Sequence, residues 1–419
     1  MHIFTTVFLS FLAASVLVRL WLTQRQITHV EAHHDNVPAA FADSITLPDH
    51  QRAADYSCSK LRVGRVMLGW ETLWLLLWTI GGGINLVDQW FAGFEYSPLI
   101  TGIGVIFTLT LISSLLDLPF SLYHTFVIEE RFGFNKTTLA TWFVDMVKTA
   151  LLMIVLGAPL LAAILWLMNQ AGEHWWIYAW LLWMGFSLTM IWAYPAFIAP
   201  LFNKFSQLEN SSLRARIDDL LSRCGFQSRG VYVVDGSRRS SHGNAYFTGF
   251  GKNKRIVFYD TLLESLSEDE VEAVLAHELG HFKRKHITKS LMLSAVISAA
   301  GFALLAWLMR SDWFYSSLGV ETASTHTALM LFMMVMPVFT YFISPLFSAM
   351  SRKHEFEADE FAHSNSDYKA LISALVNMYR DNASTLTPDP LHSMFYDSHP
   401  PASIRINHLE NIASSRSSG

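Results

Sequence analysis

The sequence is poor in charge for its length. Only 16% of its 419 residues are Asp, Glu, Lys or Arg, whereas 52% are hydrophobic; an average soluble domain is about 25% charged. Because charge is costly in hydrocarbon, this shortage is typical of a chain embedded in a lipid bilayer. A net charge of −5 also argues against a nucleic-acid partner, which would require a basic surface.

Cysteine is nearly absent. The two cysteines, Cys58 and Cys224, form neither a C-x-x-C pair nor a cluster with metal-ligand spacing. We therefore predict two free thiols and no disulfide framework.

Long apolar runs are abundant. A membrane-spanning helix needs about 20 apolar residues. Seven stretches of the chain meet this requirement: 3–22, 66–87, 98–122, 146–168, 175–200, 287–309 and 326–350. The first lacks the basic start and the clean cleavage site of a signal peptide, so we predict that it is a true span.

Lys and Arg alternate between the short loops. Loops 23–65 and 123–145 contain these residues, whereas loops 88–97 and 169–174 contain none. Cytosolic loops carry the excess of positive charge. We therefore predict an external N-terminus and a cytosolic C-terminus.

The predicted spans divide the chain into four parts. These are an N-terminal membrane region (1–200), an insert (201–286), two further spans (287–350) and a tail (351–419). The insert and the tail share the cytosolic side, as two distant segments must if they build one site. The predicted fold class is an α-helical membrane protein with a small cytosolic α+β domain.

The insert has the pattern of a small α+β domain. An amphipathic helix is expected at 211–225, closed by its final glycine. Short strands separated by turn residues are expected at 231–234, 244–250 and 255–259. A further helix begins at Ser267, which forms a predicted capping box with Glu270, and Leu275 and Leu279 mark its apolar face.

This last helix carries His277, Glu278 and His281 in an H-E-x-x-H pattern. Residues four apart project from one face of a helix, so both imidazoles can bind one Zn²⁺ while Glu278 acts as the general base. The alternative is a helix with surface histidines. The helical context and the capping box favour the metal site.

A catalytic zinc ion usually has three protein ligands and one open position. The segment 351–364 is the best source of the third ligand, because it follows the last span on the cytosolic side. Glu355 and Asp359 share one helix face, whereas Glu357 and Glu360 lie on others. Spacing alone does not choose among them, and a solvated acidic helix is the alternative.

HELGH combined with E-F-E-A-D after the last span resembles the type I CAAX prenyl endopeptidases, a family of membrane zinc metalloproteases. Blocks at 129–138, 238–263, 351–362 and 396–409 also match the family, so the resemblance covers most of the chain. It implies one Zn²⁺ per chain and a barrel of seven transmembrane helices around a water-filled chamber.

The resemblance also implies site roles. Glu355 would be the third zinc ligand, and Asp359 would orient a ligand histidine. Asn244, together with Ala245 and Tyr246, would lie on the strand that lines the substrate groove. His399 and Arg405 would be further catalytic residues, in contact with the substrate or the oxyanion.

Several ionisable residues lie in or beside the apolar runs: Glu71, Asp117, Asp145 and Lys148. Such groups normally face a bundle interior or water, as a chamber would require. The alternative is polar helix packing, or span ends that are placed imprecisely.

The resemblance predicts a peptide or protein substrate, including C-terminal prenylated CAAX peptides, laid beside the strand 244–250 by main-chain pairing. An HtpX-like quality-control protease is the first alternative. An intramembrane protease of the site-two kind is disfavoured by the charged flanks of HELGH, and a transporter has no use for that motif. We expect a bacterial inner-membrane location, with the endoplasmic reticulum as the alternative.

Overall fold

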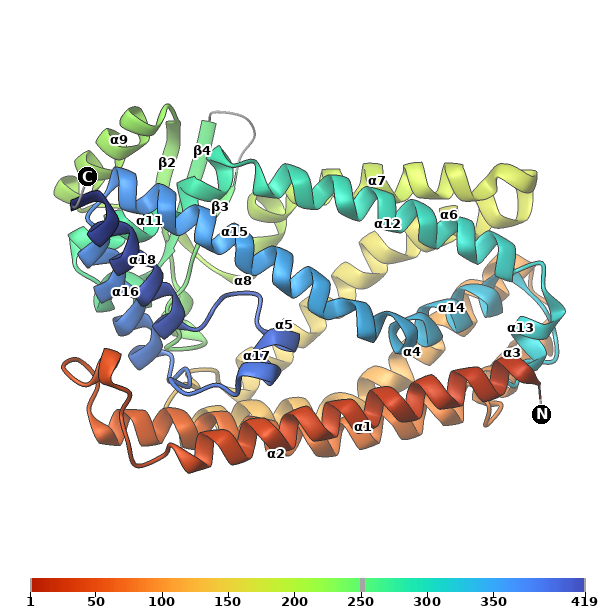
Figure 1. Ribbon diagram of the computed structural model, residues 1–419. Coiled ribbons are helices and arrows are strands. Elements are labelled where there is room, and N and C mark those ends of the chain that lie inside the picture. Colours follow the sequence, from red (N-terminus) through yellow and green to blue (C-terminus); the bar gives the residue numbers. More distant parts are fainter. Residues whose placement is uncertain (1, 249–252, 418–419) are drawn as a thin grey trace.

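The structure consists mainly of long helices and includes a small sheet. The computed structural model describes residues 2–248 and 253–417. In Figure 1 the long helices extend across the view, and the sheet lies with several shorter helices at one end. The helices of the elongated part are α1 (Ile3–Ala32), α2 (Leu47–Trp78), α3 (Gly83–Ala92), α4 (Pro98–Tyr123), α5 (Leu139–Leu152), α6 (Ala158–Gln170), α7 (Trp175–Ala193), α8 (Ala199–Phe202), α12 (His286–Leu308), α13 (Asp312–Ser316) and α14 (Thr325–Thr340).

Six helical stretches within the described residues are long and apolar enough to cross a membrane. They are Ile3–Ala32, Pro98–Glu129, Leu139–Gln170, Gly172–Phe202, His286–Leu308 and Thr325–Asn365. Turns of π-helix continue or join some of these helices, as at Met153–Gly157 between α5 and α6. The stretches correspond to six of the seven spans predicted from the sequence.

The predicted span 66–87 is not a single helix. Helix α2 begins at Leu47 and ends at Trp78, and α3 starts after a glycine run in which Gly82 has a φ of 78°. Since only the last 13 residues of α2 belong to the predicted apolar run, that part is shorter than the roughly 20 residues that a span needs. The N-terminal half of α2 carries charged residues, which lowers its hydropathy.

The last apolar stretch continues without interruption into the tail. Helix α14 passes through a short 3₁₀ turn, Tyr341–Ile343, into α15 (Ser344–Asn365). The tail then forms α16 (Tyr368–Asp381), α17 (Pro390–Tyr396) and α18 (Ala402–Ser417). The helix predicted at 351–364 is therefore the end of the helix that begins in the last span.

The described part of the chain contains one four-stranded sheet with the order β1-β2-β4-β3. Its strands are β1 (Phe205–Gln207), β2 (Gln227–Val234), β3 (Ala245–Thr248) and β4 (Asn253–Tyr259). Strands β2 and β4 are parallel, and β3 pairs antiparallel with β4 at one edge. The three predicted strands are confirmed, except that residues 249 and 250 lie outside the described residues.

The helices beside the sheet also match the prediction. Helix α9 (Ser211–Cys224) ends at Gly225, which has a φ of 79°. A short helix, α10 (Asp260–Ser265), precedes α11 (Glu268–Lys283), whose predicted capping box is present. Both cysteines are free, as predicted, and both are buried.

One apolar core joins the insert to the tail. Ile217 of α9, Phe258 of β4 and Leu275 of α11 are buried in the same cluster as Leu371 of α16 and Leu409 of α18. The predicted apolar face of α11 thus packs inside this core. The shared core holds the insert and the tail together and fixes α11 against α15.

Candidate metal centre

Helices α11 and α15 lie in close contact. A Cβ atom at Gly280 would lie 2.9 Å from Cα of Ala358, so only glycine permits this approach of the two backbones. His277 and His281 lie one turn apart on α11, and Glu355 lies one turn before Ala358 on α15. The packing of the two helices therefore brings these three side chains together.

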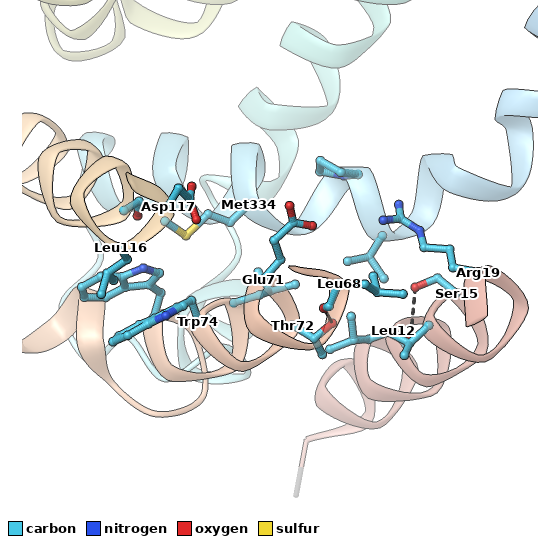
Figure 2. A pocket seen from close by; sticks show the side chains of 16 residues that line it. Leu12, Ser15, Arg19, Leu68, Glu71, Thr72, Trp74, Leu116, Asp117 and Met334 are labelled. Carbon is cyan, nitrogen blue, oxygen red and sulfur yellow. Dashed lines mark hydrogen bonds between the residues drawn. The ribbon is translucent and has the colours of Figure 1, made fainter. Parts of the chain in front are cut away.

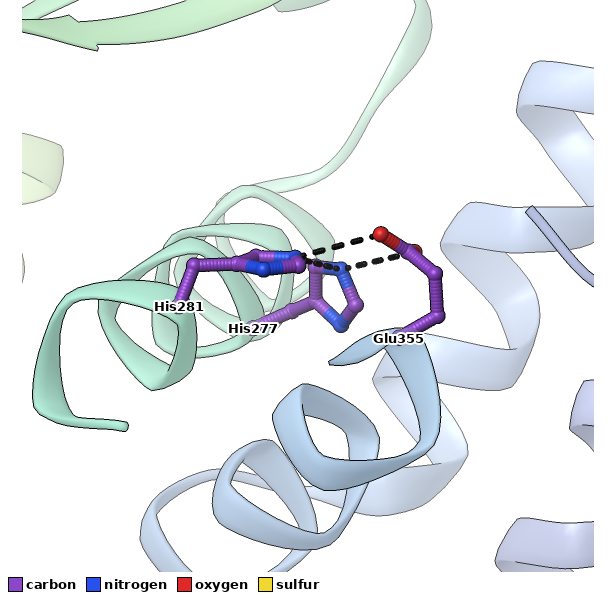
Figure 3. Close-up of side chains that lie close together, drawn as sticks. All are labelled: His277, His281 and Glu355. Carbon is purple, nitrogen blue, oxygen red and sulfur yellow. Dashed lines mark hydrogen bonds and ion pairs between the residues drawn. The ribbon is translucent and has the colours of Figure 1, made fainter. Parts of the chain in front are cut away.

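His277, His281 and Glu355 converge on one point (Figure 3). Nε2 of His281 lies 3.3 Å from Nε2 of His277 and 3.3 Å from Oε1 of Glu355, and Nε2 of His277 lies 3.4 Å from Oε2 of Glu355. All three ligand atoms lie within 4.8 Å of one another.

These distances fit a zinc ion. With bonds of about 2.0–2.1 Å and tetrahedral geometry, neighbouring zinc ligand atoms are about 3.3 Å apart. Oε2 of Glu355 is buried, and among the described residues its nearest polar neighbours are Nε2 of His277 at 3.4 Å and Nη1 of Arg405 at 3.6 Å, both longer than a good hydrogen bond. A buried carboxylate oxygen that is poorly hydrogen-bonded is costly unless a cation or a proton satisfies it. The residues present therefore suit a divalent cation with nitrogen and oxygen ligands.

The ring nitrogen of His277 that points away from the other two ligands contacts Asp359. This Nδ1 lies 2.8 Å from Oδ1 of Asp359, which is fully buried. Burial, the largest influence, and the nearby Arg405 lower the pKa of His277, but hydrogen bonds with Asp359 and Glu355 outweigh them and raise it to about 9. Asp359 therefore has the place that was expected of a residue orienting a ligand histidine.

Glu278 and His399 are predicted catalytic residues with solvent-accessible side chains. Glu278 is half-buried and follows His277 on α11, so it can reach water, as a general base must. Nε2 of His399 lies 3.4 Å from Oε1 of Glu355, while its side chain remains 64% exposed. His399 is thus a solvent-exposed neighbour of Glu355.

Arg405 occupies a different environment. It is 7% exposed, and its guanidinium forms two hydrogen bonds with Asp359 and one contact with Nδ1 of His277 at 3.2 Å. Its Nη1 also lies 3.6 Å from Oε2 of Glu355. The structure therefore places Arg405 behind the ligands, where it contacts the residues that support the centre.

Asn244, Ala245 and Tyr246 lie at the start of β3 or beside it. Asn244 is exposed and its backbone oxygen accepts a hydrogen bond from the backbone N–H of Tyr259. Within the described residues, no hydrogen bond or ion pair joins the three to the metal-ligand set. Strand β3 reaches the metal helix through Phe247, whose ring lies 5.7 Å from that of Phe282 on α11.

Sequence reasoning missed one part of the site. His286 lies 3.0 Å from His281, Nδ1 to Nδ1, and also contacts Glu357. A residue five positions after His281 would point away from it on a continuous helix. The sequence feature that could have identified His286 is that it is the third histidine of HELGHFKRKH. Helical periodicity alone places it on a different face from His277 and His281.

Two of the four ionisable residues in the apolar runs face a cavity of about 300 Å³. Glu71 and Asp117 line it together with Arg19 (Figure 2). Asp145 instead pairs with Arg239 of the insert at 2.7 Å. Lys148 donates to the backbone oxygen of Leu201 at 2.7 Å, so these two belong to the span ends.

The helix with the metal motif is separate from the apolar stretches. Helix α11 packs in the core around the sheet and lies outside the six helical stretches that could cross a membrane. A site-two arrangement, with the motif inside a hydrophobic span, does not fit this position.

Comparison with protein families covers nearly the whole chain. Residues 26–204 match the family described as "CAAX prenyl protease N-terminal, five membrane helices". Residues 207–413 match "Peptidase family M48". The two matches meet close to the predicted boundary between the N-terminal membrane region and the insert.

Curated relatives and a solved structure agree with this match. The chain is 42% identical to CAAX prenyl protease 1 homolog of Arabidopsis thaliana over 71% of this chain and 70% of that one. It is 35% identical to the Homo sapiens homolog over 72% of each chain. The crystal structure of S. mikatae Ste24p superposes with a TM-score of 0.90 at 30% identity, covering 98% of this chain and 99% of that one.

Proposed function

The chain belongs to the CAAX prenyl protease family of multi-pass membrane metallopeptidases, and on this premise we propose how its site works. One zinc ion would be held by His277, His281 and Glu355. The observation that carries this assignment is the convergence of their three ligand atoms within 4.8 Å from two separate helices. When bound, zinc would polarise the substrate carbonyl and make water a stronger nucleophile.

Side chains around the ligands have three further roles, which are proton transfer, oxyanion binding and orientation of a ligand. Glu278 accepts a proton from the attacking water and passes it to the leaving amine, which is the role of the glutamate in this motif. His399 donates a hydrogen bond to the developing oxyanion, since it is exposed and lies beside Glu355. Asp359 keeps the proton of His277 on Nδ1 and leaves Nε2 free for the metal.

The substrate is an extended peptide that carries a prenyl group near its C-terminus. The relatives are named CAAX prenyl proteases, and β3 is an edge strand to which a peptide could add by main-chain hydrogen bonds. Asn244, Ala245 and Tyr246 then line the substrate groove. Because strand addition tolerates many side chains, the lipid supplies much of the selection.

In this proposal seven helices surround a chamber, with α2 as the seventh wall element beside α1. The insert 201–286 and the tail 351–419 form a cytosolic catalytic part. The cavity lined by Glu71, Asp117 and Arg19 supports an interior that holds polar groups. The membrane would be a bacterial inner membrane or the endoplasmic reticulum.

An HtpX-like quality-control activity is the second candidate, favoured by the weak sequence specificity of an edge strand. The two are separated by the cleavage rates of one peptide with and without a farnesyl group, at equal detergent concentration. A large gain with the lipid supports prenyl-protein processing, and equal rates support quality control. No cleavage of either peptide by zinc-loaded protein would contradict both.

A further inference from the structure

A chain of hydrogen bonds leads away from the second metal-binding histidine. Nδ1 of His281 lies 3.0 Å from Nδ1 of His286, and Nε2 of His286 lies 2.9 Å from Oε2 of Glu357. Neither His286 nor Glu357 has a part in the reaction described above. We propose that these two are positioning residues that hold His281 in its metal-binding tautomer, an inference that rests on the proposed metal centre.

The protons can be placed along this chain in only one consistent way. If Nε2 of His281 binds the metal, its ring proton is on Nδ1, and this N–H donates to Nδ1 of His286. Nδ1 of His286 is then an acceptor, so the proton of His286 is on Nε2 and donates to the carboxylate of Glu357. Each donor has one acceptor, as in the carboxylate–histidine–metal arrangements that fix ligand rings.

The backbone makes the contact between the two histidines. In a continuous helix, a residue five positions on is rotated by about 140°, so His286 would face away from His281. Instead Lys285, between α11 and α12, has a φ of 57° and a ψ of 32°, a conformation that non-glycine residues rarely adopt. This break turns His286 back toward His281.

The ring of His286 is fixed by packing. Its side chain is 3% exposed, and it stacks on the ring of His354 with centroids 4.0 Å apart and planes 12° apart. The Glu357 side chain is 25% exposed, and Nζ of Lys353 lies 4.0 Å from its Oε1. The acceptor for His281 is therefore carried by the first residue of α12 and held in place by side chains of α15.

This arrangement ties the metal centre to two long helices. His286 is the first residue of the apolar stretch His286–Leu308, and Glu357 lies in the stretch Thr325–Asn365. A shift of α12 against α15 would separate His286 from Glu357 and release the ring of His281. His277 is held independently by Asp359, so the two histidine ligands have separate supports.

The test measures zinc affinity by chelator competition on the full chain in detergent. His286→Ala is expected to weaken zinc binding by about 10–100-fold, the usual effect of removing such a partner. Glu357→Ala is expected to weaken it by a smaller factor, while Glu357→Gln should stay close to the parent protein because its amide oxygen still accepts. Glu360→Ala is the matched control on the same helix, since Glu360 contacts His408 and not His286.

Two further variants make the test independent of folding defects. His286→Asn keeps an acceptor near the position of Nδ1 and should bind zinc more tightly than His286→Ala. The double variant His286→Ala/Glu357→Ala should bind zinc no more weakly than His286→Ala alone, because the chain acts as a unit. Zinc affinities of His286→Ala and Glu360→Ala that were equal, or additive losses in the double variant, would overturn the proposal.

The failure of the underlying metal centre would look different. In that case the parent protein would hold no zinc, or His281→Ala would hold it as tightly as the parent. If the parent binds zinc and His281→Ala loses it, while His286→Ala is unaffected, only the positioning role is wrong.

Discussion

The guanidinium of Arg405 donates two hydrogen bonds to the carboxylate of Asp359, from Nε to Oδ2 at 2.8 Å and from Nη2 to Oδ1 at 2.6 Å. Such a two-pronged contact fixes the carboxylate in direction as well as in charge. Because Asp359 in turn contacts His277, the position of a metal ligand depends on a residue of α18. The tail is therefore part of the support of the metal centre.

The first prediction concerns this support. Arg405→Ala should weaken zinc binding by about 10–100-fold and lower the thermal stability, because removing one partner of a buried ion pair costs about 3–5 kcal/mol. The measurements are chelator competition and a thermal melt of the metal-free protein. Unchanged zinc affinity, with a fall in kcat alone, would instead support the substrate or oxyanion contact expected from the sequence.

His399 should behave in the opposite way. Its side chain is 64% exposed and lies 3.4 Å from Oε1 of Glu355, a distance too long for a strong hydrogen bond, so His399→Ala should leave zinc occupancy and stability intact. The value of kcat should fall by about 10²–10³-fold, as for the loss of an oxyanion donor. Zinc content by mass spectrometry and steady-state kinetics provide the check, and loss of zinc would make His399 a ligand.

The third prediction follows from the pKa of about 9 for His277 in the metal-free site. The metal binds only the neutral ring nitrogen. Below pH 9 zinc must displace a proton, and its affinity should fall by about tenfold per pH unit from this group alone. Calorimetry in two buffers with different ionisation enthalpies would show proton release at pH 7.5; binding without any release would contradict the raised pKa.

Membrane orientation is the fourth prediction. Cysteines introduced at residues 90–95 should react with an impermeant reagent from outside, and those introduced in exposed parts of the insert only after the membrane is opened. The native background should be low, because Cys58 and Cys224 are both 4% exposed. An insert labelled from outside would reverse the assignment made from the loop charges.

Local patterns predicted much of the site. The spacing of His277 and His281 and the capping box at Ser267 are properties of one helix, so the sequence alone could place them. Glu355 could not be chosen over Glu357 by spacing, because the choice depends on how α15 packs against Gly280. The family resemblance supplied Glu355 and Asp359; the structure places Glu355 beside His277 and His281 and Asp359 beside His277, and both roles stay predictions.

The remaining features depend on contacts between distant segments or on single backbone conformations. The left-handed backbone conformation of Lys285 brings His286 close to His281. No sequence pattern predicts that a lysine adopts this conformation. Helix α2 ends at Trp78, shortly before the glycine run that begins at Gly81, although the apolar run predicted as the second span continues to residue 87. Strand β1 has only three residues, too few for a periodic signal, and it forms because β2 offers a partner.

The last prediction separates metal binding from catalysis. Glu278 is half-buried beside His277 and has no place among the three converging ligands, so Glu278→Gln should keep full zinc occupancy. The amide cannot accept the proton of the attacking water, and kcat should fall by about 10²–10⁴-fold, the usual contribution of a general base. Zinc content and peptide cleavage would be measured on the same preparation, with His277→Ala as the variant that should lose both together. Loss of zinc from Glu278→Gln would mean that this carboxylate is a ligand, and the general base would then have to be sought elsewhere in the site.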